Sequence, residues 1–281
     1  MGILSNTLHT LYKKPLIFIL TVIAALPVCY ISQFNPVPAL FSGFGSIGKS
    51  GVLSSVVSLL QFLWEPDIFR NTVLALIAVS FLTAVITSLY LPGYFNILNH
   101  AVLEYKGKRR AFGDGFRRFF TRILLVNLRV AFVVCIFVLF SIIALVPALV
   151  LSRAVSGNNP QMFLVALVID VITAVALYFA LMFLRVYILY WYSSIINGFK
   201  KPFRTGKCIA DSSFWRIFRS MALYDIFFVC CYVIIGSIQN DIVSFLVKLI
   251  FYTMFFSLYF SFIFNSFKIN TASYKGTKAL F

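Results

Sequence analysis

The chain has 281 residues, of which 61% are hydrophobic, 18% aromatic and only 11% charged, and its mean hydropathy is +0.97. A soluble domain is about 45–50% apolar and about 25% charged, so this composition excludes a soluble globular protein and a disordered chain. The formal net charge of +16 can indicate nucleic-acid binding, but in so apolar a chain we expect anionic membrane lipids, and no nucleic acid, as partners of the cations.

Six continuous apolar stretches are long enough to cross a bilayer as helices, which takes about 20 residues each. They lack the period-two alternation of a membrane barrel, so we predict an all-α, polytopic membrane protein that forms a single integral domain over 1–281. In chain order, the predicted spans are 15–32, 72–98, 123–151, 162–190, 217–236 and 242–264.

The first span follows Lys13 and Lys14, as in a signal peptide, but no clean small-residue cleavage site comes after it, so we expect it to be retained as an anchor. The next segment contains Gly43–Ser50, which satisfies the P-loop pattern. A P-loop follows a buried β-strand, and Pro36 and Pro38 disfavour a strand at this position, so we expect no nucleotide binding. Residues 34–68 are expected to be either re-entrant or interfacial.

Lys and Arg residues are distributed asymmetrically among the connections. Most of the 24 lie in the N-terminal segment, in the connections after the second and fourth spans, and in the C-terminal tail. The positive-inside rule therefore predicts that both termini and both basic connections are cytoplasmic. Chain size and basic loops favour the bacterial inner membrane as the location.

An ungapped shift of 98 residues aligns two parts of the chain, placing Tyr94 over Tyr192 and Phe116 over Phe214. Each part consists of a span that runs toward the cytoplasm, a basic connection, an amphipathic helix and a span that runs away from the cytoplasm. We therefore predict two parallel hairpin repeats, about 72–151 and 162–236, related by a pseudo-two-fold axis along the membrane normal. The alternative is chance similarity between apolar segments.

Each predicted repeat contains a segment with one apolar and one cationic face. At ~100° per residue, the first segment places aromatic residues opposite arginines, and Asp114 and Asp211-Ser212-Ser213 could cap the two helices. We predict that both segments lie in the inner interface before turning into the spans that follow. The candidate lipid-interacting residues are Phe116, Arg118, Arg122, Phe214, Arg216 and Arg219.

Charged residues within spans are the other candidates, because they are costly in lipid unless they serve a purpose. Asp170 lies about eight residues into the fourth span, and Lys248 lies near the outer end of the sixth. They form the candidate intramembrane polar site, with either a transport-linked or a purely structural role.

The Leu11-Tyr12-Lys13-Lys14-Pro15 entry and the segments at Phe116 and Phe214 resemble a group of uncharacterised six-helix bacterial membrane proteins. They also resemble the membrane-domain family fused to some glycerophosphodiester phosphodiesterases. The resemblance implies an integral membrane role and carries over no catalytic residues.

Two functions remain open. The first is a non-enzymatic membrane assembly, scaffold or lipid-interacting factor with basic cytoplasmic hairpins, and the alternative is a small-molecule or lipid transporter with a site near Asp170. His9 and His100 lie far apart, and the five cysteines suggest neither a disulfide framework nor a metal site, so we expect no catalytic residues, no metal and no cofactor.

Overall fold

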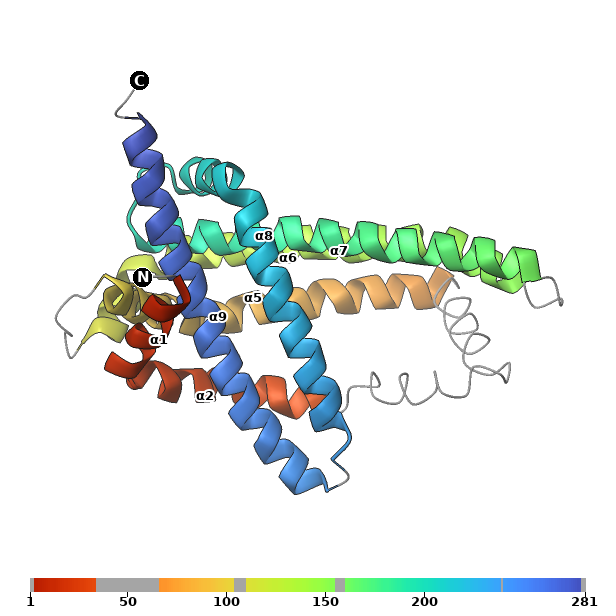
Figure 1. The fold of residues 1–281 in the computed structure, drawn as a ribbon, viewed down its shortest axis with the longest axis horizontal. Coiled ribbons are helices and arrows are strands. Elements are labelled where there is room, and N and C mark those ends of the chain that lie inside the picture. The colour runs from red at the N-terminus through yellow and green to blue at the C-terminus, as the bar shows by residue number, and fades with distance from the viewer. Residues whose placement is uncertain (1–2, 34–65, 104–109, 155–159, 239, 279–281) are drawn as a thin grey trace. The chain divides into compact units, whose positions relative to one another are not determined.

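A computed structural model of the chain describes residues 3–33, 66–103, 110–154, 160–238 and 240–278, and every regular element within them is an α-helix (Figure 1). The predicted all-α class is therefore confirmed. The P-loop-like pattern and most of the predicted re-entrant or interfacial segment lie outside the described residues. The helices are α1 (Ile3–Lys13), α2 (Leu16–Gln33), α5 (Pro66–Val102), α6 (Ala111–Ala154), α7 (Pro160–Ile196), α8 (Pro202–Gly236) and α9 (Asp241–Lys278).

Five of these helices contain segments long and apolar enough to cross a membrane, which supports a membrane-embedded protein. They contain the second to sixth predicted spans, and the first predicted span lies in α2. The helices α1 and α2 would together make a sixth crossing, although they meet at a bend of 93°. The five segments are Val73–Val102, Ala111–Ser141, Leu167–Ile196, Pro202–Gly236 and Asp241–Ala272.

The bend between α1 and α2 falls at Lys14 and Pro15, because proline lacks a backbone N–H and disfavours helical geometry in the residue before it. The turn is closed by a backbone hydrogen bond of 3.1 Å from the Ile17 amide to the Lys14 carbonyl. Thr7 in α1 is buried, and α1 packs on α9. The N-terminal helix thus belongs to the packed structure.

The described helices divide into two compact units, and α5, α6 and α7 each contribute to both. Unit 1 comprises Met1–Pro38, Leu89–Ile123 and Val186–Phe281, and unit 2 comprises Ala39–Ser88 and Leu124–Arg185.

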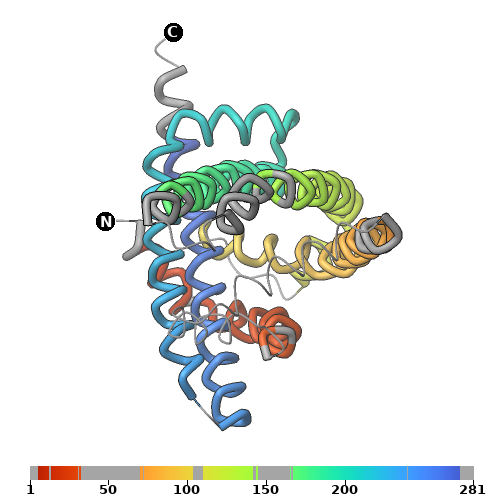
Figure 2. The backbone as a smooth tube through the Cα atoms, turned by 90° about the vertical axis from the view of Figure 1, so that its right-hand side faces the viewer, coloured from red at the N-terminus to blue at the C-terminus, as the bar shows by residue number. Residues whose placement is uncertain are grey.

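Unit 1 is built around α9, which packs against α1, α2 and α8. Aromatic rings fill much of this core, as in the contacts of Phe95 with Phe264 and of Phe228 with Phe255, whose ring centroids lie 5.3 Å and 4.8 Å apart. The helices α8 and α9 run antiparallel side by side, so the start of α8 and the end of α9 lie at the same end of the pair (Figure 2).

Unit 2 joins the first part of α5 to the second part of α6 through a polar contact. The Asn127 amide nitrogen donates hydrogen bonds to Ser88 Oγ at 2.8 Å and to Thr87 Oγ1 at 3.1 Å. Elsewhere in this unit large apolar side chains such as Phe81 and Phe132 are exposed, as expected for surfaces that face acyl chains. This amide, together with the 3.3 Å contact between Cys135 Sγ and Ser80 Oγ, joins a helix pair whose outer surface is apolar.

The start of α6 lies against α5 so closely that only glycine fits at one position. A Cβ atom on Gly115 would lie 2.5 Å from the Cβ of Asn96 and 2.8 Å from the Pro92 carbonyl oxygen. The same approach lets the Asn96 side-chain amide donate a 2.7 Å hydrogen bond to the Ala111 carbonyl. Gly113, two residues earlier, has open space around its Cβ position.

We therefore expect Gly115→Ala to lower the free energy of unfolding by about 1–3 kcal/mol, because the added methyl group overpacks the contact between α5 and α6. Gly113→Ala should be neutral or stabilising by up to about 1 kcal/mol, since alanine favours the helix and meets no neighbour. Unfolding of the purified protein by SDS titration measures both, and equal stability of the two variants would contradict the close approach.

Candidate functional site

The start of α8 is a separate amphipathic segment that ends at a bend. It follows a turn in which Gly198 has a φ of +73°, and Pro202 occupies the first turn, where a missing N–H costs nothing. Ser213 has non-helical dihedral angles, φ −130° and ψ 15°, which divide α8 into residues 202–212 and 214–236. The chain thus changes direction before it enters the fifth predicted span (Figures 1 and 2).

The apolar face of this segment is fixed to the end of α7. Gly206, Ile209 and Ala210 are buried, and a Cβ on Gly206 would lie 3.0 Å from the Tyr190 carbonyl oxygen. The Tyr187 hydroxyl donates a hydrogen bond to Asp211 Oδ1. The segment is therefore held with a defined face outward.

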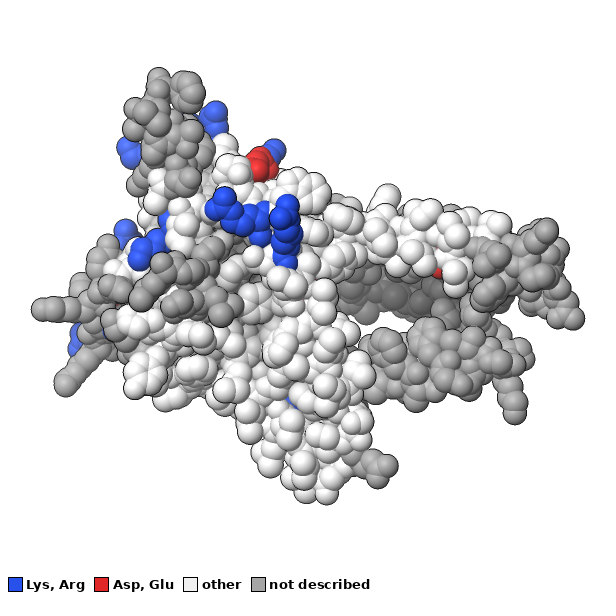
Figure 3. All heavy atoms as spheres, in the orientation of Figure 1, with Lys and Arg blue, Asp and Glu red and all other residues white. Residues whose placement is uncertain are grey.

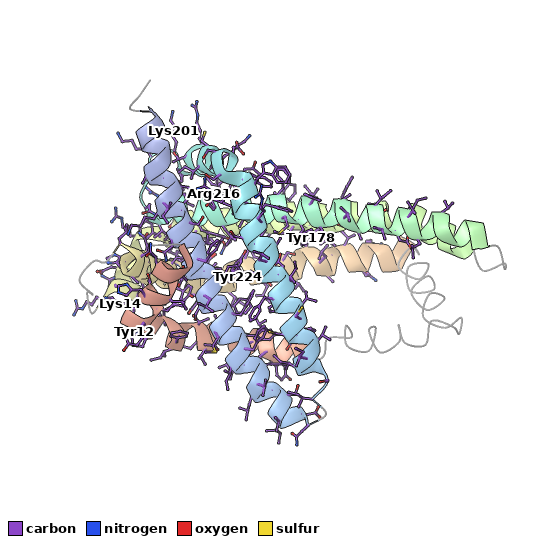
Figure 4. The ribbon with its side chains drawn as sticks, viewed as in Figure 1. Tyr12, Lys14, Tyr178, Lys201, Arg216 and Tyr224 are labelled. Atoms are coloured by element: carbon purple, nitrogen blue, oxygen red, sulfur yellow. The ribbon has the colours of Figure 1, made fainter. Side chains whose placement is uncertain are left out.

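The outward face of α8 is cationic. Lys201 and Arg216 mark this surface in Figure 4, and Figure 3 shows blue Lys and Arg atoms gathered around the start of α8. Trp215, which is 62% exposed, lies between these cations in sequence, and its ring packs on Phe218 at 5.7 Å. The exposed cations of this region are Lys200, Lys201, Arg204, Lys207, Arg216 and Arg219.

The start of α6 has the same division of faces. Ile123 is buried and Phe116 and Phe120 are half-buried, whereas Arg118 and Arg122 are exposed, as the helical pattern predicts. The Arg118 guanidinium lies over the Phe119 ring, 5.2 Å from its centroid, a cation–π contact that restrains the side chain.

Two expectations about these segments are wrong. Helix α6 runs without a break from Ala111 to Ala154, so its amphipathic part does not turn before the span, because no glycine or proline lies between Gly115 and the start of the predicted span at residue 123. Asp114 lies inside the first turn of α6 and does not cap that helix, whereas the predicted capping group Asp211-Ser212-Ser213 lies at the break between the two parts of α8. Helix formation in α6 thus begins earlier than Asp114 suggested.

Both cationic segments belong to unit 1, although they are about 98 residues apart in the sequence. An Nη atom of Arg118 reaches to 4.0 Å from the Cβ position of Gly198, in the turn that precedes α8. We call the exposed cations of these two segments, Arg117, Arg118, Arg122, Lys200, Lys201, Arg204, Lys207, Arg216 and Arg219, the cationic surface of unit 1.

The predicted intramembrane pair is divided between the units. Asp170 is exposed on the part of α7 that belongs to unit 2, and Lys248 is buried on α9 in unit 1. Their pairing stays a prediction. In the described part of the chain, no three His, Cys, Asp or Glu side chains are grouped so that they could hold a metal ion.

A row of buried polar residues on α9 was not predicted from the sequence. Thr253, Ser257, Ser261 and Asn265 follow one another at intervals of four, and all are buried. The Asn265 amide donates to Thr7 Oγ1 of α1 at 3.5 Å, whereas the hydroxyls of Ser257 and Ser261 have no hydrogen-bond partner among the described residues. The four-residue spacing within an apolar span was the available signal.

No family model, curated protein or solved structure matches the chain. The resemblance based on the Lys14-Pro15 entry and on the Phe116 and Phe214 segments therefore stays a prediction. The function has to be argued from the surfaces of the chain itself.

Proposed function

We propose that the protein is a non-enzymatic integral membrane protein that engages anionic lipids through the cationic surface of unit 1, as a membrane scaffold or assembly factor. One observation carries this proposal. Two segments that are distant in the sequence, each with its apolar face packed and its cations exposed, lie in the same compact unit. A role limited to setting topology would not require the two segments to come together.

The composition of this surface suits a headgroup layer. An exposed Lys or Arg near an anionic leaflet contributes roughly 1 kcal/mol of attraction. Trp215 adds an amphipathic ring, which favours the boundary between headgroups and acyl chains. Because Arg118 is stacked on Phe119, little side-chain freedom would be lost when its guanidinium meets a phosphate.

The finer architecture belongs to the same proposal: six spans in a bacterial inner membrane, both termini in the cytoplasm, and two parallel repeats. Arg216 is exposed in the first half of α8, and Lys268 is exposed near the end of α9. The start of α8 and the end of α9 lie at the same end of this antiparallel helix pair (Figure 1), which supports placing both cations on the same side of the membrane. The carbonyls of Pro92 and Tyr190, 98 residues apart, each face a glycine of the following helix, but these glycines, Gly115 and Gly206, do not align at the same shift, so the repeat rests on the sequence pattern alone.

Transport of a small molecule or lipid is the second candidate, and α9 favours it. Buried polar side chains continue from Ser244 to Asn270, a length of about 39 Å along a helix, which exceeds the hydrocarbon thickness of about 30 Å. The unpartnered hydroxyls of Ser257 and Ser261 are suited to water or a polar solute.

Lipid engagement predicts that neutralising Arg118, Arg122, Arg216 and Arg219 to Gln reduces the enrichment of phosphatidylglycerol around the protein at least tenfold. Four charges at roughly 1 kcal/mol each set the upper limit of the effect. Mass-spectrometric counting of lipids that copurify with the full chain in polymer-bounded bilayer discs provides the measurement. The matched variant with all four residues changed to Lys should keep the enrichment, and an unchanged Gln variant would contradict the proposal.

The proposed orientation predicts that reporters inserted at Gly107 and Thr205 are both cytoplasmic. Green fluorescent protein should fluoresce and alkaline phosphatase should be inactive at each site, because the positive-inside rule retains these connections. Reporters inserted near Lys49, which is predicted to lie on the other side of the membrane, serve as a control that should give the opposite signals. Alkaline phosphatase activity at either basic connection would reverse the orientation.

The transport alternative predicts that Asp170→Asn lowers solute uptake by reconstituted protein at least tenfold, because an intramembrane carboxylate on a transport path is needed in its charged or proton-carrying form. Asp241→Asn, at the exposed start of α9, is the matched control. Uptake that is indifferent to Asp170→Asn would remove that residue from any transport mechanism.

A further inference from the structure

A tight turn joins the end of α7 to the start of α8 and carries two neighbouring lysines. Gly198 ends α7 in the left-handed conformation, with a φ of +73°, and its amide donates a 2.9 Å hydrogen bond to the Ile195 carbonyl. Lys200 and Lys201 follow directly, and both are exposed. Two ammonium groups therefore stand immediately after the point where α7 ends.

Arg118 of α6 brings a third cation to this turn. One of its Nη atoms lies 4.0 Å from the position that a Cβ atom on Gly198 would occupy, and no other described atom outside the adjacent residues lies within 4 Å of that position. The guanidinium also lies over the Phe119 ring, 5.2 Å from its centroid. Because Arg118 and Gly198 are both exposed, the cation is held at an open face of the turn, where a ligand has access to it.

These three cations lack a negative partner within the described chain. Asp114 lies one turn before Arg118, at the spacing that allows ion pairs on a helix. No described carboxylate, that of Asp114 included, forms an ion pair with any of the three. Like charges that are brought together repel one another, and an anion placed between them turns this repulsion into attraction. The meeting point of the two segments is therefore suited to an anion.

The turn lies close to an aromatic contact that is typical of the membrane interface. Trp191, half-buried near the end of α7, packs its ring on Phe203 at 5.4 Å, and Phe203 comes two residues after Lys201. Tryptophan favours the boundary between headgroups and acyl chains, so the adjoining ammonium groups can extend into the phosphate layer. This position favours a lipid headgroup over a soluble anion.

The number of cations favours a headgroup with two negative charges. One phosphodiester group would neutralise only one of the three, whereas two such groups joined by a glycerol can accept hydrogen bonds from α6 on one side and from the turn on the other. The stacked guanidinium presents a planar fork for bidentate contact with one phosphate, and the lysines act as point charges toward the other. Basic pockets between membrane helices bind such diphosphatidyl headgroups.

We propose that Arg118, Lys200 and Lys201 bind the headgroup of one diphosphatidyl lipid of the cardiolipin class, with one phosphate on the guanidinium and the other on the ammonium groups. This inference rests on the proposed function, because it requires that the cationic surface of unit 1 faces lipid headgroups. It adds selectivity to that function: the remaining cations attract any anionic lipid, whereas this turn prefers the lipid with two phosphates.

Native mass spectrometry of the full chain in detergent tests the site by measuring one Kd for cardiolipin and one for phosphatidylglycerol. The unaltered chain should bind cardiolipin at least tenfold more tightly, and changing Arg118, Lys200 and Lys201 together to Gln should reduce this preference to about twofold or less. The reason is that the triple variant keeps the other cations of the surface, which do not distinguish the two lipids.

A matched control removes the same number of charges elsewhere on the cationic surface. Changing Lys207, Arg216 and Arg219 together to Gln should weaken the binding of both lipids and keep the preference for cardiolipin. Cardiolipin also has more acyl chains than phosphatidylglycerol, but a preference that came from the chains would persist in both variants.

Four results would overturn the site: equal Kd values for the two lipids on the unaltered chain, a preference that persists in the Arg118, Lys200 and Lys201 variant, an equal loss of preference in the control, or displacement of cardiolipin by millimolar inorganic pyrophosphate, which would make the occupant a soluble anion. The first comparison needs no variant, so it applies even if a variant does not fold. Failure of the proposed function gives a different result, because neither anionic lipid would then bind more tightly than phosphatidylcholine.

Discussion

Polar side chains inside a bilayer must find their hydrogen-bond partners within the protein, and this constraint organises unit 1 around α9. That helix carries buried serines, asparagines and a lysine, which other helices have to cover. Asn270 donates to the Tyr190 hydroxyl at 3.0 Å, and the same hydroxyl lies 3.1 Å from Ser266 Oγ. The end of α7 is thus attached to α9 by polar contacts rather than by apolar packing alone, which lipid would not favour over its own tails.

Hydropathy alone predicted the helical class and the positions of five apolar helices long enough to cross a membrane, because the energetic requirement for a crossing depends on local composition. It could not predict α1, whose sequence is too short and mixed to cross a bilayer and which becomes ordered by packing on α9. The bend at Pro15 could have been predicted from the sequence, since proline disfavours a helical conformation in the residue before it. A helix start at Asp211-Ser212-Ser213 was predictable from its capping residues, but the docking of residues 202–212 on α7 was not, because it depends on contacts between helices.

The cationic surface was partly predictable for the same reason. Helical periodicity separated Ile123 from Arg118 and Arg122 correctly, because both faces belong to one helix. The meeting of the two cationic segments in unit 1 depends on contacts between helices, such as that of Gly115 with Pro92, which no local pattern encodes. Likewise, Lys248 was recognisable as a costly residue from its position in an apolar span, whereas its burial depends on the packing of other helices on α9.

The contact between Asn265 and Thr7 joins positions 258 residues apart, and the Lys268 ammonium donates a 2.8 Å hydrogen bond to the Val102 carbonyl, 166 residues away. At a synthesis rate of about 5–20 residues per second, α1 is made roughly 10–50 s before Asn265 is added to the chain. During that interval Thr7 lacks its partner on α9, so a hydrogen bond to water at the membrane surface would have to replace it.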